Sequence, residues 1–215
     1  MIEKPLQRSL GIIGFFFAVS VGSVIGADAA QLLGDLDALQ CYHNNGYIRC
    51  RNLQSGEDWP VCKHRESREA WPGAINRDAE KLTCENGMQV IVVNLDGGNL
   101  KTVAPSNTSN AHFWRDENGD DWVVYTGLEV VDRSSPTWMV KIDTETNEAI
   151  ESTRKQIADV QFSCGLNGSG EYLGEAWPQV VIKEMETGRV SSSTGPCMGS
   201  IHPGDKPWMM HEEDA

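Results

Sequence analysis

The sequence predicts an all-β protein assembled from small antiparallel sheets. After residue 70 the apolar residues form short β-branched or aromatic runs of strand length, and Gly, Asn, Asp, Ser and Pro separate these runs. Helical periodicity is almost absent, and only residues 30–39 favour a short helix. The clearest predicted strands are Val90–Val93, Trp122–Tyr125, Trp138–Val140 and Val180–Ile182.

Composition limits the classes of partner. The 215 residues include 31 acidic and 18 basic side chains, which gives a formal net charge of −13. A phosphate backbone or an anionic lipid surface needs a basic stripe, and this chain has none. We therefore expect no nucleic-acid partner, and membrane contact only through the leader described next.

Residues 1–29 resemble a secretory leader. Lys4 and Arg8 precede an apolar run from Leu10 to Gly26, and Ala27–Ala29 offers a small-x-small cleavage site. Cleavage would start the mature chain near Ala30. The competing interpretation is an uncleaved anchor, because the run is at the short limit of a membrane-spanning helix. Both predict a periplasmic or secreted protein, anchored through residues 10–26 in the second case.

Export changes the interpretation of the six cysteines, which all lie in the mature chain. An even number in an oxidising compartment predicts up to three disulfides, with 15 connectivities open. The alternative is that some are small buried apolar residues. Three of them could staple the segment 30–69. The candidates are Cys41, Cys50, Cys62, Cys84, Cys164 and Cys197.

A period in the chain suggests how the strands are grouped. Equivalent turn positions and equivalent ends of closing strands recur at intervals of about 35–50 residues, which is the spacing of four-stranded propeller blades. Each blade has two apolar faces that only neighbouring blades can cover. The turn positions are Ala79, Gly119, Gly170 and Asp205, and the strand ends are Leu95, Ile142 and Met185.

These units resemble the WD40-like repeats of TolB-type β-propellers. The Ser-Pro-Asp-Gly turn of that family has degenerate counterparts at Asn76–Ala79, Asn167–Gly170 and His202–Asp205. Its closing hairpin is matched best by Asn94–Leu100 and also by Glu186–Gly188. The resemblance covers residues 70–215 and implies a propeller domain that serves as an exported binding scaffold.

The resemblance departs from the family in the number of blades. About three and a half blades are recognisable, whereas the family closes with six or seven. Three explanations stay open: residues 38–69 supply further strands, two chains complete one another, or the chain is the N-terminal part of a longer protein. An incomplete propeller has an unpaired edge that favours self-association.

No catalytic or metal-binding pattern occurs in the sequence. There is no G-x-S-x-G element, no phosphate loop and no paired histidine spacing. Asp116–Asp121 fails the spacing of a calcium loop and is better explained as a polar turn. We expect no cofactor and no metal, and the catalytic residues, if any, are unknown.

Four aromatic residues are candidates for binding. Aromatics near the blade openings could form a platform for a peptide or a sugar on the open face of the propeller. The alternative, which the sequence favours, is that they fill the layers between blades. These residues are Trp71, Trp114, Trp208 and His112.

Three functions are therefore compatible with the sequence. The first is a non-enzymatic, exported scaffold that binds a protein, a peptide or a glycan. The second is a carbohydrate-active enzyme, either a polysaccharide lyase or a glycosidase, which would need a carboxylate or cation cluster drawn from several blades. The third is the N-terminal part of a larger envelope or sensor protein. Fold alone does not choose among them.

Overall fold

The structure is a computed structural model, and it describes eight stretches of the chain. The predicted leader and nearly all of the predicted helix at 30–39 lie outside them, as do Trp208, Cys197 and the turn at 202–205. The described residues are 38–63, 70–104, 107–127, 135–160, 163–175, 180–193, 199–201 and 209–211.

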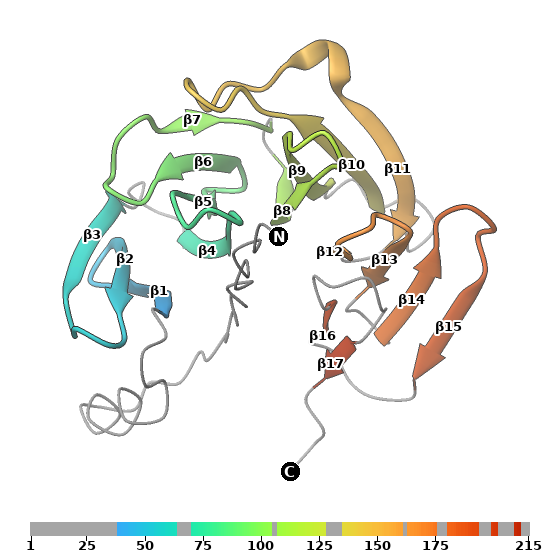
Figure 1. Cartoon of the computed structure of the whole chain (residues 1–215), viewed down its shortest axis with the longest axis horizontal. Coiled ribbons are helices and arrows are strands. Elements are labelled where there is room, and N and C mark those ends of the chain that lie inside the picture. The colour runs from blue at the N-terminus through green and yellow to red at the C-terminus, as the bar shows by residue number, and fades with distance from the viewer. Residues whose placement is uncertain are drawn as a thin grey trace, which may run out of the picture.

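All of the sheets are antiparallel, and they follow one another along the chain as blades (Figure 1). The first blade has three strands, β1 (Leu39–Asn44), β2 (Tyr47–Asn52) and β3 (Asp58–Lys63). The second blade has four, β4 (Ala70–Ile75), β5 (Lys81–Asn86), β6 (Val90–Asn94) and β7 (Lys101–Thr102).

The third and fourth blades also have four strands each. The third consists of β8 (Thr108–Arg115), β9 (Asp121–Gly127), β10 (Ser135–Lys141) and β11 (Lys155–Val160). The fourth consists of β12 (Ser163–Leu166), β13 (Tyr172–Glu175), β14 (Val180–Glu184) and β15 (Val190–Ser193). A two-stranded sheet, β16 (Gly199–Ile201) and β17 (Met209–His211), follows.

The predicted all-β class and its four-stranded blades are confirmed. Among the described residues the one helical element is a 3-10 turn, Glu151–Thr153. Figure 1 shows the blades fanned along an arc, with β4, β8 and β12 on its inner side and β7, β11 and β15 on its outer side. Residues 39–63, whose strands the sequence left undefined, form the first blade, as in the first of the three explanations above.

Alternation along the strands explains how the blades stack. In β6, Ile91 and Val93 belong to the cluster shared with the first blade, whereas Val90 and Val92 belong to the cluster shared with the third. Successive residues of a strand point to opposite faces, so one apolar run contributes to two interfaces. This explains why the strand reads as continuously apolar rather than alternating.

The predicted turn positions are structurally equivalent. Ala79, Gly119 and Gly170 adopt φ values of +56°, +85° and +76°. Each donates its backbone N–H to the carbonyl three residues earlier, at 3.0 Å in all three turns. A repeated turn that needs positive φ explains why Gly recurs at this place in the sequence.

Candidate functional site

Among the described residues, the first blade has no strand in the inner position that β4, β8 and β12 occupy in the other blades. At one end of β3, the Trp59 indole N–H donates to the carbonyl of Leu95, beside the β4–β5 turn, at 2.6 Å. At the other end, the Asn86 amide donates to the carbonyl of Lys63 at 3.4 Å. Since β5 begins at that turn and ends at Asn86, β3 runs in the same direction as β5.

The direction of β1 then shows which position it occupies in the first blade. It runs parallel to β3, because both pair antiparallel with β2, and therefore runs parallel to β5 and opposite to the inner strand β4. Thus β1, β2 and β3 correspond to the second, third and fourth strands of a blade. Among the described residues no strand pairs with β1 on its inner side.

The backbone groups that face this open edge follow from the register. Cys41 and Cys50 are directly opposite one another, with Cα atoms 4.2 Å apart, the short spacing of a pair without mutual hydrogen bonds. Ala38, three residues earlier, instead accepts a hydrogen bond from Leu53 at 2.9 Å. The alternation directs the N–H and C=O groups of Leu39 and Cys41 away from β2, toward the open edge.

The face of the first blade that is turned away from the second blade is polar. The Arg49 guanidinium pairs with Asp58 at 2.7 Å, and the Tyr42 hydroxyl donates to the same carboxylate, so one group from each strand meets there. Burial opposes the charge on Asp58, but the hydrogen bonds from Tyr42 and Arg49 outweigh it and hold its pKa below the usual value. A further blade on this face would have to desolvate these charges. The edge of β1 is therefore the more favourable place for an added strand.

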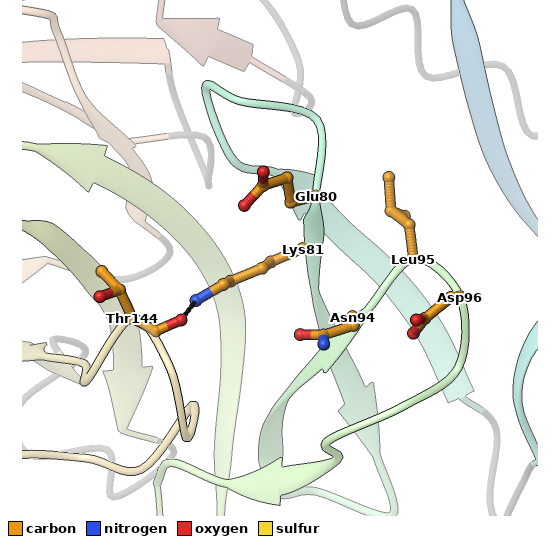
Figure 2. A pocket seen from close by; sticks show the side chains of 6 residues that line it. All are labelled: Glu80, Lys81, Asn94, Leu95, Asp96 and Thr144. Carbon is orange, nitrogen blue, oxygen red and sulfur yellow. Dashed lines mark hydrogen bonds between the residues drawn. The ribbon is translucent and has the colours of Figure 1, made fainter.

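A pocket of about 360 Å³ lies at the seam between the second and third blades (Figure 2). Lys81 is only 5% exposed, and its ammonium reaches across the seam to the carbonyl of Thr144. Glu80, Asn94 and Asp96 also line the pocket, and Figure 2 shows Asn94 and Asp96 on the side away from Thr144. The buried ammonium of Lys81 is thus bound to the third blade, and the contact holds the second and third blades together.

A cluster of charged side chains also joins the second and third blades, at the β4–β5 turn. Arg115 pairs with Asp121 at 2.7 Å and bidentately with Asp78 of the β4–β5 turn. Asn76 donates to the other oxygen of Asp121 at 3.2 Å. The Asp121 carboxylate is 3% exposed, so its charge depends on these donors. Residue patterns could not identify this cluster, because its members come from two blades.

The aromatic candidates lie at different seams. Trp71 is 49% exposed and lies on β4 opposite Glu85, whose carboxylate accepts a hydrogen bond from the backbone N–H of Asn110 in the third blade. Trp114 lies on β8 and contacts the turn at Gly170 in the fourth blade; a Cβ there would lie 2.7 Å from its ring. The structure therefore does not bring Trp71 and Trp114 together.

His112 shares the seam between the third and fourth blades with Trp114. Its ring packs on Gly165 of β12, where an added Cβ would lie 3.2 Å from it. Burial lowers the pKa of His112 to about 4, although a hydrogen bond with the backbone of Ser163 opposes the shift. The ring is therefore neutral at pH 7. A role in binding for these aromatics stays a prediction.

Among the cysteines whose side chains the structure describes, one disulfide is formed. It joins Cys41 to Cys50 across the β1–β2 pair, which is compatible with an oxidising compartment. Cys62 and Cys84 are buried thiols, and the side chain of Cys164 and the whole of Cys197 lie outside the described residues.

No three His, Cys, Asp or Glu side chains in the described stretches gather closely enough to hold a metal ion. In the same stretches no helix is long and apolar enough to cross a membrane.

Comparison with known proteins identifies no family for this chain. No family model matches the chain, and a search of curated proteins finds no match. An oligogalacturonate lyase in complex with manganese is similar, with 17% identity, 78% of this chain and 45% of that chain covered, and a TM-score of 0.42. The chain thus spans less than half the length of that lyase.

Two further solved structures are similar. One is from a mitotic checkpoint complex, at 13% identity, with 86% of this chain and 61% of that chain covered and a TM-score of 0.40. The other is from a nidogen/laminin complex, at 12% identity, with 68% of this chain and 71% of that chain covered and a TM-score of 0.35. All three neighbours are propeller folds. At these TM-scores they carry no argument about function, and the fold assignment rests on the blades themselves.

Proposed function

We propose that the chain is an exported, TolB-like propeller module that binds a partner protein by accepting an extended segment beside β1. The observation that carries this proposal is the strand direction of the first blade, which leaves the place of an inner strand open among the described residues. Strand addition to a sheet edge is a common mode of peptide recognition, in which backbone hydrogen bonds supply the affinity.

The edge supports this mode for two reasons. Leu39 and Cys41 direct backbone groups toward it, and the Cys41–Cys50 disulfide fixes β1 against β2, so the edge is ordered before a segment arrives. An ordered edge lowers the entropy lost on binding. The added strand would run antiparallel to β1 and lie next to β4, in the position that inner strands occupy in the neighbouring blades.

A peptide taken from the chain itself tests this proposal. Residues 107–116 contain the inner strand β8, and a fluorescent peptide of this sequence is a surrogate for an inner strand beside β1. We expect saturable binding by fluorescence anisotropy, and none with a scrambled peptide. Light scattering on the free chain separates this outcome from pairing between two copies.

Two variants at one position sharpen the test. Leu39→Pro removes an N–H that points to the open edge, and proline is tolerated at the first residue of a strand. Leu39→Ala removes the side chain but keeps the N–H. The proposal expects Leu39→Pro to lose most of the binding and Leu39→Ala to retain it. Equal binding by both variants, or no binding by the unmodified chain, would overturn it.

A further inference from the structure

Two buried thiols meet across the seam between the first and second blades. Cys62 lies on β3 and Cys84 on β5, and both belong to the same apolar cluster. Their side chains are 6% and 0% exposed, and the two thiol groups are hydrogen-bonded to each other. A disulfide between these two side chains would link the first and second blades covalently.

We propose that Cys62 and Cys84 form a disulfide that links the first blade to the second in the mature protein. The cluster around them already holds the Cys41–Cys50 disulfide, since Cys50 is buried within it and Cys41 packs against it. A compartment that oxidises one pair supplies the conditions for the other.

The chemistry needs an oxidant, and a protein dithiol oxidase supplies it as a disulfide. The Cys62 thiolate attacks one sulfur of the oxidant and releases the other as a thiolate, which leaves a mixed disulfide. Cys84 then loses its proton and attacks the Cys62 sulfur, which expels the second thiolate of the oxidant. Two electrons and two protons pass from the cysteine pair to the oxidant, which ends as a dithiol.

The pKa values of the two thiols differ in the direction that attack by Cys62 before Cys84 requires. The hydrogen bond from Cys84 lowers the pKa of the Cys62 thiol, and burial raises the pKa of Cys84. Once the two thiols are in contact, the lower pKa makes Cys62 the first nucleophile. Because both side chains are covered once the blades have packed, oxidation takes place while the first blade is still closing onto the second.

Peptide mapping without reduction is the direct test. Trypsin releases Cys62 in residues 52–63 and Cys84 in residues 82–101, because Arg51, Lys63, Lys81 and Lys101 flank them. The full chain, exported into an oxidising compartment and alkylated in denaturant, should yield these two fragments joined. Alkylation of both thiols would overturn the proposal, as would a bond from either to a fragment carrying Cys164 or Cys197.

A stability measurement supplies the second readout. Closing the loop between residues 62 and 84 should raise the folding equilibrium constant by roughly 100- to 500-fold. Reduction should therefore lower the urea midpoint of the unmodified chain more than that of a Cys62→Ala/Cys84→Ala variant. The matched variant Cys41→Ala/Cys50→Ala should keep the part of the shift that the Cys62–Cys84 bond causes. Equal shifts in the unmodified chain and in the Cys62→Ala/Cys84→Ala variant would contradict the proposal.

Discussion

Replacing Ala79 with glycine should stabilise the protein. Ala79 has a φ of +56° in the turn between β4 and β5, where an L-residue with a Cβ costs about 1–2 kcal/mol relative to glycine. Glycine regains this energy but loses about 0.4–1 kcal/mol through the greater freedom of the unfolded chain. The difference is a net gain of about 0–1.6 kcal/mol, with a middle value of about 0.8 kcal/mol, whereas an exposed alanine in ordinary β conformation would lose stability on the same change.

The equivalent turns provide controls for this prediction. At Gly119 an added Cβ has nothing within 4 Å, so Gly119→Ala tests backbone strain alone and should cost about 1 kcal/mol. At Gly170 the Cβ would lie 2.7 Å from the Trp114 ring, so Gly170→Ala should cost more. Urea denaturation with unchanged m-values measures all three changes. A destabilising Ala79→Gly, or a neutral Gly119→Ala, would refute the equivalence of these turns.

Two further predictions concern the seams. Protonation of His112 requires hydration that its seam does not provide, and its pKa of about 4 lies below the ordinary value of about 6.5. The stability that neutral His112 contributes is therefore complete above pH 6.5 and is lost as the pH falls toward 4, by up to about 3 kcal/mol. In a profile of the urea midpoint against pH, His112→Gln should flatten the slope between these two values. An unchanged slope would contradict the prediction. Arg115→Met strands the buried charge of Asp121 and should cost about 3 kcal/mol by the same method, whereas Lys101→Met, which breaks an exposed pair with Glu148, should cost under about 1 kcal/mol. Equal losses would contradict the burial of Asp121.

The repeated blades were predictable because their turn chemistry is local. The turns at Gly119 and Gly170 need a positive φ, which favours glycine and so makes these turns recognisable in the sequence. The apolar run at Val90–Val93 identifies a strand that is buried on both faces. The strands of the first blade were left undefined, as one of three open explanations, because they contain polar or charged residues and share no turn with the later blades. Asn45-Gly46, both with positive φ, was the hairpin signal that could have identified it.

The candidate site was not predictable from residue spacing. Whether β1 is an inner strand or a second strand depends on its direction relative to β4, and that direction is set by how two blades pack. The contacts that establish it, from Trp59 to Leu95 and from Asn86 to Lys63, join residues far apart in the chain. In the same way, Trp114 and Trp71 read alike in the sequence, but they lie at different seams.

Amide hydrogen exchange along β1 tests the central claim most directly. In the free, monomeric chain, the amides of Gln40 and Tyr42 should be protected by their bonds to β2, and those of Leu39 and Cys41 should exchange rapidly. This alternation is the pattern of a strand with one partner. Equal protection of all four amides in the monomer would mean that the inner edge is already paired, and would contradict both the open first blade and the binding mode proposed for it.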